Sequence, residues 1–240
     1  MAQIAIKRIL KDITELNTNN LNSHGIYHVT NEDDICSLSV MMIGPLNTPY
    51  ENGYYFFDIT FPEEYPWKPP IVKFISMCTK IRFNPNLYIN GKVCLSLINT
   101  WNGPKWTSCN TLSSVLLSIQ GLVFNEFPLV NEPGFETIKE IHHIYNNVIE
   151  YGNIYVHIYQ LVKQISNNNC NTHIQLFKDI ITKNFIKTYN SVYDKLKILH
   201  KKNKYVDEFI CSTYGINVKN NTTEILDNIE LIYDALSDNI

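Results

Sequence analysis

The chain has 240 residues, of which 45% are hydrophobic and 18% charged, a globular balance that argues against extensive disorder. The formal charge of −3 lacks the basic excess of most nucleic-acid-binding domains, so we expect no nucleic-acid partner. The most apolar stretch, residues 112–124, is shorter than the roughly 20 residues of a membrane span and contains polar side chains, so we expect a buried helix and no membrane association. The first residues show no charged lead followed by an apolar run, which predicts no secretory signal.

The six cysteines form neither a C-x-x-C pair nor a Cys/His cluster with zinc spacing. We therefore expect free thiols, no metal, no cofactor and a cytoplasmic protein, with the nucleus as a second location. His142, His143 and His157 lie at packing positions of a helical stretch, where surface or interhelical roles are favoured over a metal site.

The first quarter of the chain predicts a helix followed by strands. Residues 3–16 carry isoleucine and leucine at helical spacing and predict an amphipathic helix. Residues 35–43 and 54–61 are rich in β-formers, and turn residues separate them, so we expect antiparallel strands. A further short strand is expected at 71–75, after a proline-rich segment at 65–70 that should be rigid and exposed.

Regular periodicity is absent from residue 81 to residue 107, where several turn signals occur. Loops of this length in a compact domain are often functional. Helical spacing resumes near Thr111 and continues to the end of the apolar stretch.

Beyond Pro133-Gly134 the composition changes, and three apolar-striped runs predict helices. The runs cover residues 141–165, 177–199 and 225–236. Gly152 is expected to weaken or kink the first run. Asn221 and Glu224 have capping-box spacing ahead of the third. The chain as a whole is expected to be an α+β core followed by a helical extension.

Cys94 differs from the other cysteines because it lies in the irregular stretch, just after a Gly-Lys turn. A loop cysteine can be a nucleophile, since thiolates attack carbonyl groups and form thioesters. Asn86, which follows a proline, is placed to aim an amide donor at a developing oxyanion. No His or Asp is locally paired with Cys94, so a cysteine-protease dyad has little support. The residues alone leave open the alternative that Cys94 is a small buried apolar residue.

Several motifs follow one another in a definite order between residues 44 and 97. They are Gly44-Pro45, Thr48-Pro49-Tyr50-Glu51-Asn52-Gly53, Phe61-Pro62, Tyr65-Pro66-Trp67-Lys68-Pro69-Pro70, Asn84-Pro85-Asn86 and Gly91-Lys92-Val93-Cys94-Leu95-Ser96-Leu97. In this order they resemble the catalytic domain of ubiquitin-conjugating enzymes. The resemblance covers roughly residues 3–135. It implies an α+β catalytic core of residues 1–136, with an N-terminal helix, a four-stranded antiparallel meander, an active-site loop and helices, followed by a helical extension of residues 137–240.

The resemblance implies that Cys94 accepts ubiquitin or a ubiquitin-like protein as a thioester from an activating enzyme. The modifier would then pass to a lysine of a protein substrate, usually with a ubiquitin ligase. Asn86 matches the asparagine credited with supporting the oxyanion or ordering the loop. A catalytically inactive variant of the same fold, serving as a ubiquitin-binding or scaffold module, is the alternative, and a cysteine hydrolase on another fold has less support.

Other positions carried over from the family concern partners. Lys7 and Arg8 fall where the first helix meets the activating enzyme and, in part, ligases. Trp67 matches the aromatic position of the ligase-facing loop, and Trp106 opens the second such loop. Glu132 matches the acidic gate residue of many members.

The chain also departs from the family pattern. Asn84 replaces the usual motif histidine, whose role is mainly structural, and Thr107-Ser108-Cys109 replaces the common Ser-Pro-Ala. The lengthened segment 99–105 and the long tail resemble a branch of large conjugating enzymes with C-terminal extensions.

Overall fold

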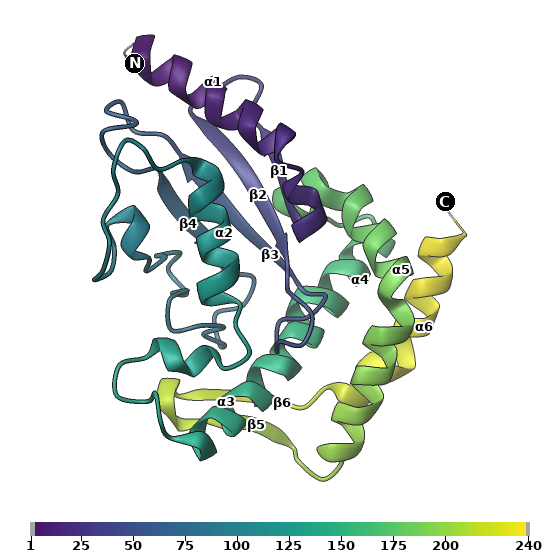
Figure 1. Ribbon diagram of the computed structural model, residues 1–240. Coiled ribbons are helices and arrows are strands. Elements are labelled where there is room, and N and C mark those ends of the chain that lie inside the picture. The colour runs from purple at the N-terminus through teal and green to yellow at the C-terminus, as the bar shows by residue number, and fades with distance from the viewer. Residues whose placement is uncertain (1–2, 239–240) are drawn as a thin grey trace.

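The computed structural model describes residues 3–238, which form helical layers around one central sheet (Figure 1). The elements of the N-terminal part are α1 (Gln3–Thr18), η1 (Leu21–His24), β1 (Ile26–Thr30), β2 (Ser37–Ile43), β3 (Tyr54–Thr60), β4 (Ile71–Ile75), η2 (Ser96–Ile98), α2 (Leu112–Val123) and η3 (Pro128–Asn131). The elements of the extension are α3 (Lys139–Gly152), η4 (Asn153–Tyr159), α4 (Gln160–Ser166), α5 (Thr172–Lys202), β5 (Glu208–Cys211), η5 (Ser212–Tyr214), β6 (Ile216–Lys219) and α6 (Thr222–Ser237). The predicted α+β class is confirmed.

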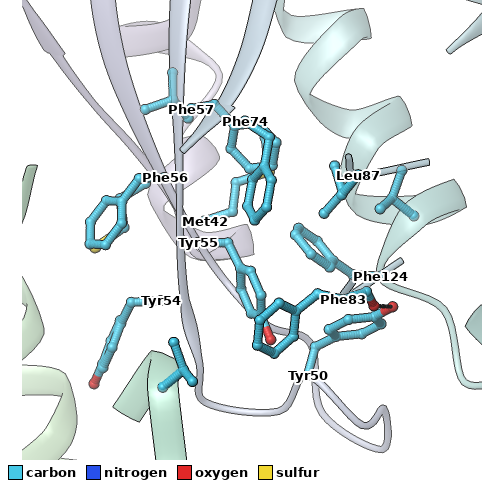
Figure 2. Close-up of a cluster of buried hydrophobic side chains, with 14 of the residues drawn as sticks. Met42, Tyr50, Tyr54, Tyr55, Phe56, Phe57, Phe74, Phe83, Leu87 and Phe124 are labelled. Atoms are coloured by element: carbon cyan, nitrogen blue, oxygen red, sulfur yellow. Dashed lines mark hydrogen bonds between the residues drawn. The ribbon is translucent and has the colours of Figure 1, made fainter. Parts of the chain in front are cut away.

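The sheet is an antiparallel meander in the order β1-β2-β3-β4, and helical elements cover both of its faces. Successive side chains of a strand point to opposite faces. Phe57 packs against Phe124, directly after α2, at a ring-centroid distance of 6.4 Å. Phe56, on the other side of β3 in Figure 2, packs against Phe177 of α5 at 6.1 Å. The central strand is therefore apolar on both faces, which explains its run of aromatic residues.

Helix α2 begins where the sequence predicted. Thr111 is its N-cap and accepts a hydrogen bond from the backbone N–H of Ser114, while the Ser114 hydroxyl accepts from the Thr111 backbone. Such reciprocal bonds satisfy backbone donors that the helix itself leaves unpaired. The capping box expected at Asn221 and Glu224 is wrong, because Asn221 makes no side-chain capping bond. Glu224 instead accepts a hydrogen bond from the hydroxyl of Tyr159.

The three helical runs of the extension are confirmed, but the first is not a uniform α-helix. After Gly152 it continues as the π-helix η4 and then as α4. A Cβ atom at position 152 would lie 2.7 Å from Cδ1 of Ile81 and 3.0 Å from Cε1 of Phe83. Glycine therefore allows this helix to approach the segment that precedes Asn84. Periodicity at steps of three and four does not reveal the wider turn.

Two features of the fold were not placed by the sequence. Strand β1 has mostly half-buried residues and a weak alternating pattern. Strands β5 and β6 form a separate antiparallel hairpin of only four residues a strand. In the proline-rich segment, Trp67 is exposed as expected, whereas Tyr65 and Pro66 are buried, so the expectation of a wholly exposed connection is wrong.

The extension and the N-terminal part share one interior. His157 of η4 is fully buried, its Nδ1 lies 2.8 Å from the Tyr54 carbonyl oxygen, and its ring stacks on Tyr55 at 4.0 Å. Tyr55 in turn donates a hydrogen bond to Oδ1 of Asn153 at 2.7 Å. Desolvation by burial lowers the pKa of His157 to about 3, so the imidazole is neutral in the folded protein. Within residues 3–238, no helix is both long enough and apolar enough to cross a membrane.

Candidate active site

Asn86 and Cys94 are held together by two reciprocal hydrogen bonds. The backbone N–H of Cys94 donates to the Asn86 carbonyl oxygen at 2.9 Å, and Nδ2 of Asn86 donates to the Cys94 carbonyl oxygen at 2.9 Å. The spacing read from the sequence therefore corresponds to a closed loop. In this conformation the Asn86 amide orders the backbone of Cys94.

Asn84 is the polar centre beneath this loop, and it is fully buried. Its Nδ2 donates to the Tyr50 hydroxyl at 2.9 Å and to the Val123 carbonyl oxygen at 2.7 Å. Its Oδ1 accepts from the backbone N–H of Asn86 at 2.8 Å. Buried polar groups are costly unless paired, and this amide satisfies both of its ends. Asn84 thus joins the loop to the core and to the end of α2.

Cys94 is only 1% exposed, although it was expected to act as a nucleophile. An open groove of about 360 Å³ borders the loop, and it includes Leu95, the next residue. Further lining residues are Asn86, Ser96, Trp101, Val130, Pro133 and Glu136. The groove lies beside Asn86 and Leu95, whereas Cys94 is not among the residues that line it.

Glu132 and Glu136, two acidic side chains in the segment that borders this groove, differ in their surroundings. Glu132, the expected gate residue, is half-buried, and its carboxylate accepts a hydrogen bond from the Tyr214 hydroxyl. Glu136 is exposed and lines the groove. Hydrogen bonds from the backbone N–H groups of Glu136 and Gly134 lower the pKa of the Glu136 carboxyl, which keeps it ionised. Sequence reasoning did not single out Glu136, because its approach to the groove depends on the turn at Gly134.

Two of the four residues expected to contact partners are exposed, one is half-buried and one is buried. Lys7 is exposed on α1, whereas Arg8 pairs with the buried Asp12 at 3.0 Å and donates to the Ser108 carbonyl oxygen at 2.7 Å. Trp67 is 71% exposed. Trp106 is 7% exposed, and its indole N–H donates to the Pro66 carbonyl oxygen at 2.7 Å. Lys7 and Trp67 are therefore free to contact a partner, while Arg8 and Trp106 connect neighbouring segments.

Several residues at the site were not found from the sequence. Arg82 stacks on Tyr88 at 3.9 Å and on Tyr214 at 4.6 Å, measured from Cζ to each ring centroid. Tyr145 donates a hydrogen bond to the Arg82 carbonyl oxygen at 2.6 Å. No local sequence motif predicts that Arg82 contacts Tyr145 and Tyr214, which lie far along the chain. Across residues 3–238, no group of three or more His, Cys, Asp or Glu residues is arranged to hold a metal ion.

Comparison with known proteins gives the family. The family model described as "Ubiquitin-conjugating enzyme" matches residues 8–146. The chain is 39% identical over 189 residues to "Probable ubiquitin-conjugating enzyme protein 17" of Caenorhabditis elegans, covering 74% of this chain and 25% of the relative. It is 43% identical over 136 residues to "Ubiquitin-conjugating enzyme E2 Z" of Danio rerio, covering 56% of this chain and 40% of the relative.

A solved ubiquitin-conjugating enzyme domain from Toxoplasma gondii is 26% identical, with a TM-score of 0.48, over 61% of this chain and 94% of that chain. The present chain spans only 25% and 40% of the two curated relatives. The family match covers more than half of the chain, including Asn86 and Cys94. The chain belongs to the ubiquitin-conjugating enzyme family.

Proposed function

We propose that this protein is an acyl carrier that receives ubiquitin or a ubiquitin-like protein as a thioester on Cys94 and transfers it to an amine of a protein substrate. The observation that carries the proposal is the closed Asn86–Cys94 pair beside an open groove, inside the region that matches the family. The pair places an amide donor on the backbone carbonyl oxygen of Cys94, and the groove gives the C-terminal tail of a modifier a place to lie.

The chemistry consists of two acyl transfers. In the first, the Cys94 thiolate attacks the carbonyl carbon of a thioester on the activating enzyme, and the activating enzyme's thiolate leaves. This step exchanges one thioester for another and is close to energy-neutral. In the second, a substrate amine attacks the same carbonyl carbon, and the Cys94 thiolate leaves as an amide forms. In both steps a negative oxygen develops on the tetrahedral carbon, where a correctly placed amide donor such as Asn86 lowers the barrier.

The second transfer also requires a neutral amine. The lysine ammonium group has a pKa of about 10.4 in water, so few lysines are deprotonated at neutral pH. Desolvation of the amine when a bound modifier covers the groove favours the neutral amine, and an ionised carboxylate nearby favours the ammonium but can take its proton. Glu136 lines the groove, whereas the carboxylate of Glu132 is already engaged by Tyr214. The gate role of Glu132 remains a proposal that requires this bond to open.

Burial of Cys94 sets a further requirement. Cys94 is only 1% exposed and so presents little of its surface to a carbonyl carbon on another protein. Charging therefore requires movement of the surrounding loop when the activating enzyme binds. We assign that contact to the exposed face of α1 around Lys7, and the contact with a ligase to the exposed Trp67. A cytoplasmic or nuclear location and the absence of nucleic-acid and membrane partners belong to the same proposal.

The division of labour along the chain follows from where the matched residues lie. All positions matched to bond chemistry precede Gly134, so residues 137–240 are proposed to select partners. Most residues of the three apolar stripes, which lie on α3 through α4, on α5 and on α6, are packed inward. Partner contacts would therefore come from its outer polar faces.

The test is a charging assay with an activating enzyme, ATP and ubiquitin, repeated with several ubiquitin-like proteins. A reductant-sensitive adduct on a non-reducing gel is the expected result. A protein that binds the modifier but forms no adduct with any activating enzyme would be a scaffold, and one that consumes conjugates would be a hydrolase. Either result would overturn the proposal.

A further inference from the structure

Tyr214 is a side chain of the extension that reaches the active-site region from two sides. It ends η5, the short turn between β5 and β6. Its hydroxyl donates a hydrogen bond to the carboxylate of Glu132, a residue 82 positions earlier in the chain. Its ring lies against the guanidinium of Arg82, with Cζ 4.6 Å from the ring centroid. One side chain therefore joins the segment before Asn84 to the segment after η3.

The first connection runs through Arg82. The guanidinium lies between the rings of Tyr214 and Tyr88, at 4.6 and 3.9 Å from the two centroids. Its Nη2 donates to the carbonyl oxygen of Pro85, the middle residue of the Asn84-Pro85-Asn86 motif. Among residues 3–238 its Nε is buried with no hydrogen-bond partner, so the rings and Pro85 hold the group in place. A shift of the Tyr214 ring would free Arg82 to leave Pro85.

The second connection runs through Glu132. Asn131, the preceding residue, donates from Nδ2 to the Leu122 carbonyl oxygen at 2.9 Å and to Oδ1 of Asn84 at 3.4 Å. The same Oδ1 accepts from the backbone N–H of Asn86 at 2.8 Å. The bond from Tyr214 to Glu132 thus restrains the segment that supports Asn84 from the other side. Both connections end at the motif that holds Cys94.

We propose that Tyr214 is a positioning residue that, through Arg82 and Glu132, holds Asn84-Pro85-Asn86 in register with Cys94 for transfer to the acceptor amine. This inference rests on the proposed function of Cys94. It also gives the extension a part in the rate of the chemical step, beyond the choice of partners. Burial and the bond to Glu132 raise the pKa of the Tyr214 phenol well above its ordinary value, so the hydroxyl remains a donor at physiological pH.

Residues other than Tyr214 also hold the β5–β6 hairpin against α3. Phe209 of β5 stacks on Tyr151 of α3 with ring centroids 4.1 Å apart, and the Tyr151 hydroxyl donates to the Lys219 carbonyl oxygen. Cys211 and Ile216, on either side of the turn, are buried. Replacing Tyr214 with alanine removes the connection to the active site and the edge contact of its ring with Tyr145 of α3, at 5.7 Å between centroids, but leaves the packing of Phe209, Cys211 and Ile216 in place.

The experiment compares Tyr214→Phe, Tyr214→Ala and the control Tyr205→Ala in the full-length chain. Phenylalanine keeps the ring against Arg82 but cannot bond Glu132, whereas alanine loses both contacts. Tyr205 is 90% exposed, so its removal tests for a general effect of deleting a tyrosine from the extension. Each protein is charged with the modifier that forms an adduct and then chased with free lysine over a concentration series.

For Tyr214→Ala we expect the maximal discharge rate at saturating lysine to fall about tenfold, within the range that a small misplacement of reacting groups costs. The half-saturating lysine concentration should change little. Tyr214→Phe should be slower by about threefold, consistent with the loss of one of two couplings, and Tyr205→Ala unchanged. Discharge within experimental error of the unmodified chain for both Tyr214 variants would overturn the inference, as would equal losses in Tyr205→Ala.

A second measurement separates failure of this inference from failure of the proposed function. Cys94 is buried, so iodoacetamide should alkylate it slowly, and peptide mass spectrometry distinguishes it from the exposed Cys109. Tyr214→Ala should accelerate alkylation of Cys94 several-fold while leaving that of Cys109 unchanged. If no variant forms an adduct but this acceleration occurs, Tyr214 does position the loop around Cys94, and the proposed carrier function is wrong. If the adduct forms and the alkylation rate of Cys94 is unaffected in both Tyr214 variants, the positioning role of Tyr214 is wrong.

Discussion

Burial of His157 predicts that acid weakens the fold by a definite amount. Its pKa is lowered from 6.5 to about 3 in the folded protein, first by desolvation and against the opposing effect of its bond to the Tyr54 carbonyl oxygen. The unfolded chain therefore binds a proton below pH 6.5 that the folded chain does not. Stability contributed by this group is full above pH 6.5 and is lost as the pH falls from 6.5 toward 3.

The size of the effect follows from the difference in proton binding. Each pH unit between the two pKa values costs about 1.4 kcal/mol, so at pH 5 the loss is about 2 kcal/mol relative to pH 7.5. Carboxylates and the other histidines also titrate in this range. The variant His157→Phe, which lacks this titration and also the bond to the Tyr54 carbonyl oxygen, provides the reference for the change with pH. Its ring can keep the stacking on Tyr55 but cannot be protonated.

The assay is urea unfolding of both proteins at pH 7.5 and pH 5, followed by far-UV circular dichroism and tyrosine fluorescence. The unmodified chain should lose about 2 kcal/mol more than His157→Phe between the two pH values. Because η4 packs against β3, both probes should report one transition. Equal pH dependence in the two proteins, or two separate transitions, would refute the argument that the imidazole is buried in an interior shared by the core and the extension.

Three further predictions concern the site and α1. Asn86→Ala should slow discharge to lysine about a hundredfold, the lower end of what an oxyanion donor contributes, because the amide also orders the Cys94 backbone. Charging should slow less. Equal losses in single-turnover assays of both steps would assign Asn86 a purely structural role. Arg8→Gln should lower the free energy of unfolding by about 3 kcal/mol, since it removes the cation paired with the buried Asp12. Lys7→Gln should leave the unfolding free energy unchanged and reduce only the rate of charging, whereas a comparable loss of stability would show that its exposed position is misjudged.

The sequence was most informative where one local pattern determined one element. The apolar stripe of 225–236 and the Thr111 start of α2 depend on residues within a few positions, and both are confirmed. The hairpin of β5 and β6 was missed because four-residue strands alternate too briefly to stand out from a loop. The π-helix η4 was missed because its wider turn serves packing at Gly152, which only the folded chain reveals.

In the candidate active site, too, local features could be predicted from the sequence and long-range contacts could not. The pairing of Asn86 with Cys94 was foreseeable from their spacing and their motifs, because both lie on one loop. The burial of Cys94, which is 1% exposed, was not foreseeable, because the same local sequence can be buried in one fold and exposed in another. The contact of Tyr214 with Glu132 joins positions 82 apart, and no periodicity connects them. Such contacts arise from how the extension packs on the core.

The most direct test of the central claim is the location of the acyl group after charging. The adduct is digested under mildly acidic conditions without reductant and analysed by mass spectrometry, using the unmodified chain, Cys94→Ser and Cys109→Ala. The modifier's C-terminal fragment should be attached at residue 94 in the unmodified chain and in Cys109→Ala. In Cys94→Ser it should appear more slowly, as an ester that resists thiol reductant and is cleaved by hydroxylamine. A reductant-labile adduct that persists in Cys94→Ser, or a fragment attached to the exposed Cys109, would contradict the assignment.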